Sequence, residues 1–482
     1  MPVISAHCFA NHRGGVGKTT LAYQVSSAYA AAHPGRKVLV IDTTDSGDLS
    51  EMLMGGIYEK RGREMLRSLI PVANVTQMFL RALVASTSTS LSDVLKAEEY
   101  EDGVLTSVVQ KMPLAKGAVE SSPLEKAKVM KRIDLEEFGI PLKQVNSRMP
   151  SNMFLCPSGL DIEHSISFSA TQRQDIIAVL LDSFQNAEGE WKVFIDTDTE
   201  LYGENGAYAN IGFGIADFIC LPLHADMSDW YGAKVLINDM QLLHDMDVSH
   251  AQVHLVLWNG LNVQFKQSCG VTVGGISKCT FIPTKAEQDI IQTLDNLVYQ
   301  EAQIMPNLFL HYNGAKTTAE EFSAKCSTCM RNFGVVGVAS KDIGVPIACI
   351  KPGIFHGVHM DYNLSIDTIK HCRENLEEIV KAIDQVDEKN NPRKICRQHL
   401  EFLKARRMER KLGIKLKLKH KSPLTTVKKR RRHSASSASK DTTSVMYKTY
   451  ALRNRYSLRE RSKQMKAKLF IDNFESSSIS TA

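Results

Sequence analysis

The sequence predicts an α/β protein with a doubly wound, mostly parallel sheet. Three observations lead to this fold class. The first 50 residues alternate between strand and helix patterns, a glycine-rich turn separates the first strand from the first helix, and short apolar runs of strand length return after residue 150. Strands that alternate with helices form βαβ units, which build parallel sheets with helices on both faces.

The first unit is contained in residues 2–42. Residues 2–10 (PVISAHCFA) are an apolar run that ends at a glycine-rich turn, so we expect a buried strand. Residues 37–42 (KVLVID) are β-branched and short, which indicates a second strand. Between them, residues 18–33 are expected to form a helix, because apolar side chains recur at helical spacing at Leu21, Ala22, Val25, Ala28 and Tyr29.

The pattern resumes in the second part of the chain. Buried strands are expected at 191–196 (WKVFID), 217–223 (DFICLPL) and 253–259 (VHLVLWN), and a short strand and turn at 154–159 (FLCPSG). Helices are expected near 169–187 and 226–246, and an amphipathic helix at 361–385 closes the domain.

Two stretches interrupt this alternation and one follows it. Residues 56–150 have a mostly helical composition without an obvious sheet strand, and residues 260–335 are irregular in pattern. We interpret both as insertions at the margins of one domain that spans residues 1–385. Residues 386–482 become basic and then serine-rich, which predicts a partly disordered tail.

The charge of the chain is divided unevenly. Residues 401–482 contain 23 Lys and Arg but 6 Asp and Glu, a net charge of +17, whereas residues 1–400 carry −11. A basic tail on an acidic body favours nucleic acid as a partner, with an anionic membrane second and a solvated tail without a ligand third. The run Lys428 to Arg432 also has the composition of a nuclear localisation signal, should the source be eukaryotic.

Composition also limits the compartment and the class of site. No apolar run of about 18 residues is present, and the N-terminus lacks a charged signal region. Ten scattered cysteines in 482 residues favour a reducing compartment, so we expect a cytoplasmic protein. Cys326 and Cys329 have the CxxC spacing of a zinc site, although two reduced thiols are the preferred interpretation.

The strongest motif is NHRGGVGKTT at residues 11–20. It follows a predicted strand and opens a predicted helix, where glycines let the backbone N–H groups wrap a polyphosphate. In such a loop Lys18 reaches the β- and γ-phosphates, and the Thr19 hydroxyl binds magnesium. The motif therefore predicts ATP and Mg²⁺ as cofactors.

This segment resembles the ParA/MinD family of dimerising ATPases, whose deviant Walker A motif is of the type NQKGGVGKTT. The resemblance implies that the ATP-binding residues are Arg13, Gly14, Gly15, Val16, Gly17, Lys18, Thr19 and Thr20. In that family the first lysine of the motif crosses a dimer interface to the partner's nucleotide, so an ATP-dependent homodimer is implied. Arg13 stands at that position and keeps the charge, which makes Arg13 and Lys18 the candidate catalytic cations.

The resemblance extends to the magnesium positions. VLVIDTTDSGDLS at 38–50 aligns with the family's VLLIDLDPQGNLS, which places Asp42 near magnesium and Thr44 where the family has its water-activating aspartate. A hydroxyl is a poor general base, so Asp45 is the candidate if the loop shifts by one residue. Asp196 ends an apolar strand as a Walker B carboxylate does, and Asn259 matches a position that contacts adenine.

The resemblance covers residues 2–50, 90–100, 152–259 and 334–385. It implies a ParA-like ATPase in DNA, plasmid or chromosome partition or in the positioning of a cargo, with a partner protein that the sequence does not identify. Two alternatives remain: a nucleotide-locked binding module with little hydrolysis, and a MinD-like regulator at a membrane.

Overall fold

The computed structural model describes residues 3–57, 61–69, 73–86, 133–159, 168–199, 206–265, 281–357, 360–389 and 392–412. The chain divides into two units, Met1–Leu424 and Thr425–Ala482, and every described residue belongs to the first. The run Lys428 to Arg432 and the serine-rich part of the tail lie outside the described residues.

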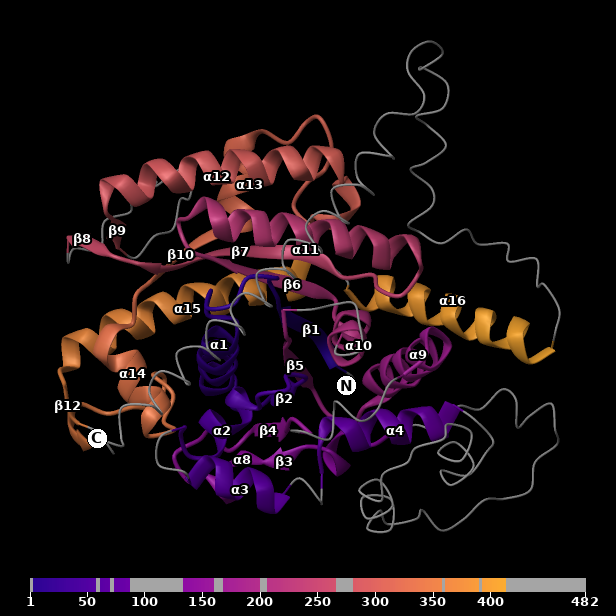
Figure 1. Cartoon of the computed structure of the whole chain (residues 1–482), viewed down its shortest axis with the longest axis horizontal. Helices are drawn as coiled ribbons and strands as arrows, with labels where there is room; N and C mark the ends of the chain where they lie inside the picture. The colour runs from indigo at the N-terminus through magenta and orange to yellow at the C-terminus, as the bar shows by residue number, and fades with distance from the viewer. Residues whose placement is uncertain are drawn as a thin grey trace, which may run out of the picture. The chain divides into compact units, whose positions relative to one another are not determined.

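A central sheet of eight strands organises the described part of the chain, with strand order β10-β7-β6-β1-β5-β2-β4-β3 (Figure 1). All neighbouring strands are parallel except β3, which is antiparallel to β4. The predicted fold class is therefore confirmed. The strands are β1 (Val3–Phe9), β2 (Lys37–Asp42), β3 (Ile140–Pro141), β4 (Met153–Cys156), β5 (Trp191–Asp196), β6 (Phe218–Leu223), β7 (Gln252–Leu261) and β10 (Ser327–Arg331).

Six of these strands were predicted, whereas β3 and β10 lie in the ranges 56–150 and 260–335 that we interpreted as insertions. β3 has only two residues. β10 is a full member of the sheet, paired in parallel with β7. Its sequence, STCMR, does not have the pattern of a buried strand, because polar residues occupy buried positions. The Ser327 hydroxyl donates a hydrogen bond to Asp295 at 2.8 Å. An apolar pattern search misses a strand whose polar side chains are paired inside the protein.

One face of the sheet is covered by α1 (Lys18–Ala32), α2 (Asp48–Met54), α14 (Gly334–Asp342) and α15 (Ile366–Lys389). Side chains from alternate positions of the strands, such as Val38 and Val40, pack against these helices. Leu39 and Ile41 point to the opposite face and are equally buried. Because both faces are covered, β2 is apolar at every position from Val38 to Ile41. Smaller helices at this margin are α3 (Arg61–Leu69) and α8 (Leu142–Val145).

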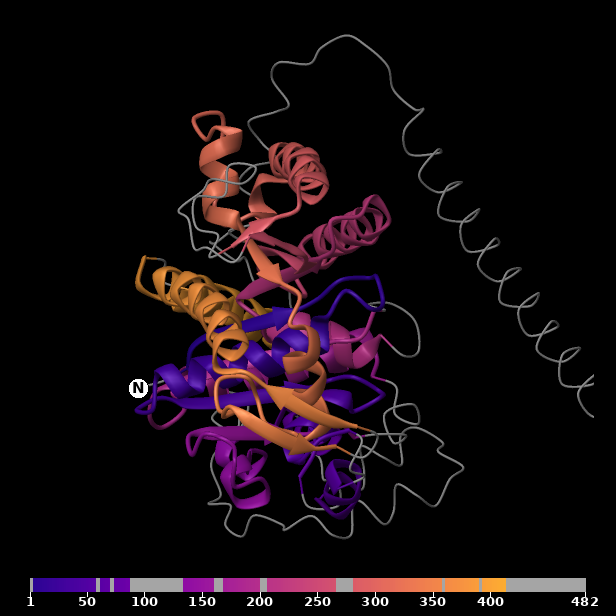
Figure 2. The same cartoon turned by 90° about the vertical axis from the view of Figure 1, so that its left-hand side faces the viewer.

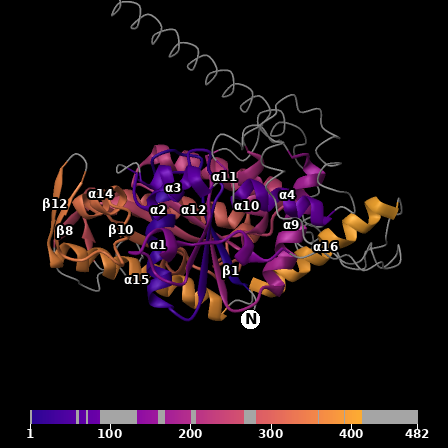
Figure 3. The ribbon, with the colours of Figure 1, turned by 90° about the horizontal axis from the view of Figure 1, so that it is seen from below.

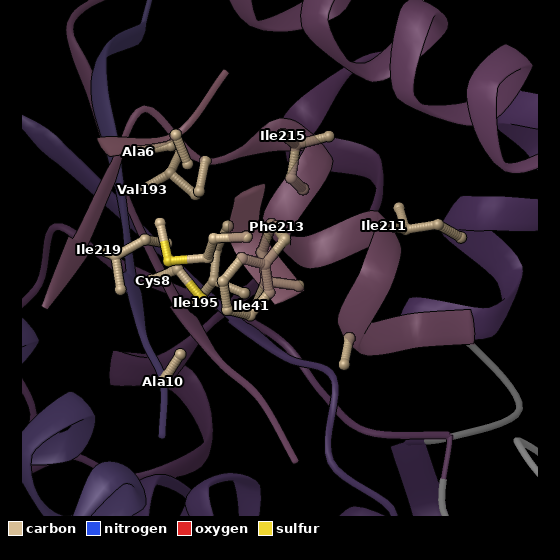
Figure 4. Close-up of a cluster of buried hydrophobic side chains, with 14 of the residues drawn as sticks. Ala6, Cys8, Ala10, Ile41, Val193, Ile195, Ile211, Phe213, Ile215 and Ile219 are labelled. Carbon is tan, nitrogen blue, oxygen red and sulfur yellow. The ribbon is translucent and has the colours of Figure 1, made fainter. Parts of the chain in front are cut away.

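The opposite face carries α4 (Val75–Ser86), α9 (Ala170–Asn186), α10 (Ala207–Ile215) and α11 (Met227–Asp245). Figure 4 shows the centre of this core, which includes Ala6 and Cys8 on β1 and Phe213 and Ile215 on α10. α10 also approaches α9 closely: a Cβ on Gly214 would lie 2.3 Å from Ile177 Cδ1.

Beyond β7 and β10, α12 (Lys285–Ile304) and α13 (Ala319–Cys326) pack against each other, as the coral helices of Figure 2 show. α12 begins with a capping box in which Thr284 and Glu287 bond each other's backbone N–H groups. The remaining short elements are η1 (Leu135–Glu137), η3 (Pro306–Leu308), the pair β8 (Val263–Phe265) and β9 (Ile282–Pro283), and the pair β11 (Gly353–His356) and β12 (Asp361–Leu364).

The packed part of the chain continues past residue 385, where we expected the tail to begin. α16 (Pro392–Leu412) lies along α9 (Figure 3), with Leu400 and Leu403 buried. Lys404 Nζ lies 2.9 Å from Asp182 Oδ1 on α9. Residues 392–412 are highly charged but also carry apolar residues at helical spacing. Composition alone therefore assigned these residues to the tail.

Within the described residues, no helix combines the length and the apolar character that crossing a bilayer requires.

Candidate nucleotide site

The loop at residues 11–17 joins the end of β1 to the start of α1. Gly15 and Gly17 have φ values of 82° and 92°, in the left-handed region that strains other residues. A Cβ on Gly17 would also lie 2.3 Å from Asn259 Nδ2. The first N–H groups of α1 have no acceptors inside the helix, so the loop presents donors and a partial positive charge to an anion.

Two asparagines connect this loop to neighbouring strands. Asn11 Nδ2 donates to the Pro222 carbonyl at the end of β6 at 2.8 Å, and Asn11 Oδ1 accepts from the Arg13 N–H at 2.9 Å. Asn259, on β7, donates to the Val16 carbonyl at 2.8 Å. Asn259 was predicted to contact adenine, and the structure gives its amide a second use, which is to support the phosphate loop.

Lys18 is the buried cation of the site. It is 8% exposed, and its Nζ donates to the Arg13 carbonyl at 3.2 Å, so the side chain lies over the loop. Burial lowers the pKa of Lys18, while the nearby carboxylates of Asp196 and Asp198 act in the opposite direction. A buried ammonium group interacts strongly with an anionic ligand, because little water screens it.

Asp196 is the candidate metal ligand. It ends β5 and pairs in register with Asp42, the last residue of β2. It is completely buried, and neither carboxylate oxygen makes a hydrogen bond of regular geometry with the described residues. Burial raises the pKa of Asp196 well above its usual range; the Asp42 carboxyl adds to this, and the Thr19 hydroxyl and Lys18 oppose it. A buried carboxylate without regular partners beside a hydroxyl fits a Mg²⁺ ligand pair of Asp196 and Thr19.

Asp42 differs from Asp196 although both end neighbouring strands. Its Oδ1 accepts from the Thr44 N–H at 3.1 Å and the Thr44 hydroxyl at 2.7 Å. Its Oδ2 accepts from the Ser50 N–H at 2.9 Å and the Ser50 hydroxyl at 2.6 Å. These four bonds give Asp42 a structural role in shaping residues 43–50. Of the predicted magnesium ligands, Asp196 and Thr19 therefore have the more open oxygens.

Thr44 is held in the same network. Its hydroxyl donates to Asp42 and accepts from the Gly47 N–H at 3.3 Å, and the residue is 3% exposed. This geometry gives Thr44 no means of taking a proton from water. Asp45, the predicted substitute, donates its backbone N–H to Asp198 Oδ2 at 2.9 Å.

Asp198 is the functional candidate that the sequence analysis did not assign a role. It lies two residues after Asp196, and burial raises its pKa to about 6, with the carboxyl groups of Asp45 and Asp42 adding to the shift. A carboxylate with this pKa can accept a proton near neutral pH. The sequence feature that could have identified Asp198 is that it is a second Asp just after the end of the strand at 191–196.

Arg13 points away from the loop. Its side chain is 56% exposed, and its Nε lies 3.4 Å from Asp229 Oδ1 on α11 of the same chain. The His224 imidazole Nδ1 lies 2.9 Å from the other oxygen of Asp229. Asp229 is buried, with 6% of its side chain exposed, so only the guanidinium end of this ion pair reaches solvent.

The other predicted site residues lie along the same loop. Gly14 and Gly15 are exposed, Val16 is buried, and Thr20 is half-buried in the first turn of α1. The fold thus brings the phosphate loop, Lys18 and the carboxylates from β2 and β5 to one edge of the sheet. This is the edge where open α/β sheets bind ligands.

A family model matches the part of the chain that contains most of this site. The profile of a family described as an AAA domain matches residues 3–253, which contain the phosphate loop, Asp42 and Asp196. The chain belongs to this family. The assignment to ParA/MinD-type P-loop ATPases, predicted from the motif at 11–20, is thereby confirmed. No curated protein sequence matches the chain.

Several solved structures are similar to this chain. A protein assigned to plasmid partition in Borrelia burgdorferi B31, bound to AMPPNP, is 13% identical, with 79% of this chain and 99% of that chain covered and a TM-score of 0.40. The pNOB8 ParA bound to nonspecific DNA is 10% identical, with 80% and 99% covered and a TM-score of 0.40. MinD from Aquifex aeolicus is 14% identical, with 78% and 97% covered and a TM-score of 0.35.

Proposed function

We propose that this chain binds ATP with Mg²⁺ in the loop at residues 11–20 and hydrolyses it to ADP and phosphate during a cycle of dimerisation. One observation supports this proposal most: Asp196, buried and without a regular hydrogen bond, lies beside Thr19 and Lys18 at the start of α1. A glycine loop, a cation and such a carboxylate are the parts that a magnesium–nucleotide complex needs.

Each part has its own task in the proposal. The N–H groups of residues 13–20 bind the phosphates, and Lys18 neutralises the β- and γ-phosphate charge. Thr19 and Asp196 hold Mg²⁺, which neutralises phosphate oxygens and fixes their orientation. Asn259 keeps the loop in shape through Val16, and we retain its contact with adenine as part of the proposal.

Hydrolysis needs a proton acceptor, and we assign this task to Asp198. The water oxygen bonds to the γ-phosphorus, the bond from this phosphorus to the β–γ bridging oxygen breaks, and the water proton passes to Asp198. Asp45 keeps Asp198 in place through its backbone N–H. Thr44 takes no part, because its hydroxyl already bonds Asp42.

Dimerisation would follow from Arg13. Its exposed guanidinium can exchange Asp229 for the nucleotide of a second copy, and the buried Asp229 carboxylate would keep its contacts with the backbone N–H and the imidazole of His224. With 18 basic residues between 413 and 482, the part of the chain that follows α16 also has the charge to bind the phosphates of DNA. We therefore propose a role in DNA partition or cargo positioning, with an unidentified partner protein.

A second candidate function has an observation of its own. Because Thr44 is locked to Asp42, the protein would bind ATP and dimerise yet turn over slowly if Asp198 cannot reach the attacking water. The chain would then be a nucleotide-locked binding module.

Steady-state ATP turnover with magnesium, with and without DNA, separates these candidates. We expect turnover that rises with DNA and disappears in Lys18→Ala. Tight ATP binding without turnover would favour the locked module. Stimulation by anionic vesicles instead of DNA would point to a membrane-associated regulator, and absence of ATP binding would overturn the proposal.

A further inference from the structure

A second group of polar side chains is buried at the other end of the sheet. Asp217 precedes β6, His250 precedes β7, and Cys396 lies on α16. One ligand atom from each of these residues lies within 4.8 Å of the others. His250 and Cys396 are 4% and 7% exposed, so water does not readily reach the group. Carboxylate, imidazole and thiol together are a set of ligands for a transition metal.

Hydrogen bonds to the fold fix this group in place. Asp217 Oδ2 accepts from the Ala6 N–H of β1 at 2.8 Å, and Asp217 Oδ1 lies 3.1 Å from His250 Nε2. Gln185 on α9 donates to Cys396 Sγ at 3.6 Å. Such supporting bonds orient the side chains of a metal site before the metal arrives.

α16 places a further imidazole beside this group of three. His399 follows Cys396 by three residues, so both lie on one face of the helix. The imidazole rings of His399 and His250 have centroids 5.0 Å apart. In the described part of the chain, His250 Nδ1 and His399 Nε2 are buried and make no hydrogen bond. A buried polar atom without a partner costs about 1–3 kcal/mol, so an unassigned partner is expected at this place.

A small cavity lies against the same residues. Its volume is about 20 Å³, and it is lined by Asp217, Cys396 and Gln185 together with apolar side chains of Ile4, Leu181, Phe184 and Ile215. A space of this size holds one water molecule or one ion. Two of the three clustered residues, Asp217 and Cys396, line this space, so it adjoins the group.

We propose that Asp217, His250 and Cys396 form a Zn²⁺ site, supported by the neighbouring His399, that fastens α16 to the amino end of the sheet. Zn²⁺ suits this set because it accepts sulfur, nitrogen and oxygen ligands, and a water molecule can complete its four-coordinate shell. Cys326 and Cys329, the zinc alternative considered from the sequence, are buried at the junction of α13 and β10 and belong to no three-ligand cluster among the described residues.

The chemistry of binding is simple. Burial raises the pKa of the Cys396 thiol, so the thiol is protonated without metal. Zn²⁺ takes the thiolate, and one proton passes to the buffer. The site lies near the start of α16, which precedes the basic tail in the sequence. The metal would therefore fasten the last described helix to the sheet and leave the nucleotide edge unchanged.

Cobalt substitution tests this site in the full chain. We expect about one Co²⁺ per chain, with a thiolate-to-cobalt charge-transfer band that is lost in Cys396→Ser and unchanged in Cys372→Ser, a matched buried cysteine on α15. His250→Ala should abolish binding, and His399→Ala should weaken it about tenfold to a hundredfold. Lys18→Ala should bind the metal normally, which separates this inference from the proposed ATP site.

Three results would overturn it. These are no bound metal after equilibration with Zn²⁺ or Co²⁺, a cobalt spectrum without a thiolate band, and a Cys396→Ser protein that binds as the wild type does. Far-ultraviolet circular dichroism of each variant identifies those that fail to fold, and for these Asp217→Asn provides a milder replacement with the same expected loss of affinity.

Discussion

The two ends of the central sheet each contain a group of buried polar side chains, and the two groups differ in how many segments of the sequence contribute to them. At the carboxyl end, Lys18 and Thr19 come from one continuous motif, and Asp196 is added from β5. At the amino end, Asp217, His250 and Cys396 come from three segments, one of which is a helix that looked like tail. The difference teaches that a site built on one continuous motif can be recognised from its local sequence, whereas a site assembled from distant segments becomes visible only in the fold.

The largest expected effect is on ATP turnover, which should depend on the carboxyl end of the sheet and not on the amino end. Asp198→Asn should lower ATP turnover about 100- to 10,000-fold, because it removes the proton acceptor. ATP affinity should change only a few-fold, as measured by titration with a fluorescent nucleotide. Cys396→Ser, at the other end, should keep wild-type turnover. A similar loss of turnover in this variant would show that the two ends do not act separately.

Substitutions at the amino end of the sheet should change the free energy of unfolding and not ATP turnover. Leu400→Ala removes a fully buried side chain of α16 and should lower the free energy of unfolding by about 2–5 kcal/mol. Urea unfolding measures this change. ATP affinity measured on the folded protein should stay the same, and a loss of affinity would show that α16 supports the nucleotide edge.

The pH dependence of turnover sharpens the assignment of Asp198. Burial raises the pKa of its carboxyl to about 6, so it is protonated below this pH and ionised above it. A proton acceptor must be ionised, and turnover should therefore rise as the pH passes upward through about 6. A rate that is flat between pH 5 and pH 8, about the range that spans this pKa, would exclude Asp198 as the base.

The smallest effect concerns the support of the phosphate loop. Asn259→Ala removes the hydrogen bond to the Val16 carbonyl, which contributes about 1 kcal/mol. ATP affinity should fall about fivefold, the equivalent of that energy. A loss of more than a hundredfold would instead favour direct recognition of the adenine, and isothermal titration calorimetry distinguishes the two.

Much of the fold was predictable because its strands are buried on both faces. β2 and β5 are mostly apolar and end in Asp, with one Lys in each strand, so both were recognised as buried strands. The helix α1 was recognised because a glycine-rich loop precedes its helical pattern. β10 was missed because Ser327 and Thr328 are polar yet buried. The Ser327 hydroxyl can be buried because it donates a hydrogen bond to Asp295 on α12, which is distant in the sequence. Such compensation cannot be seen in a local window of sequence.

The candidate site was predicted in part for a related reason. Lys18, Thr19 and Asp196 could be located from motif and strand ends. The different states of Asp42 and Asp196 could not, because both end strands in the same way. Only the fold shows that Thr44 and Ser50 occupy the oxygens of Asp42, and that Asp198 lies against Asp45.

Magnesium-dependent ATP binding by Asp196→Asn tests the central claim most directly. The account predicts that the wild type binds ATP more tightly with Mg²⁺ than with EDTA, and that Asp196→Asn loses this difference. The exposed acid variant Asp289→Asn on α12 should keep it. A wild type that binds no ATP, or an Asp196→Asn protein whose ATP affinity still depends on Mg²⁺, would contradict the account.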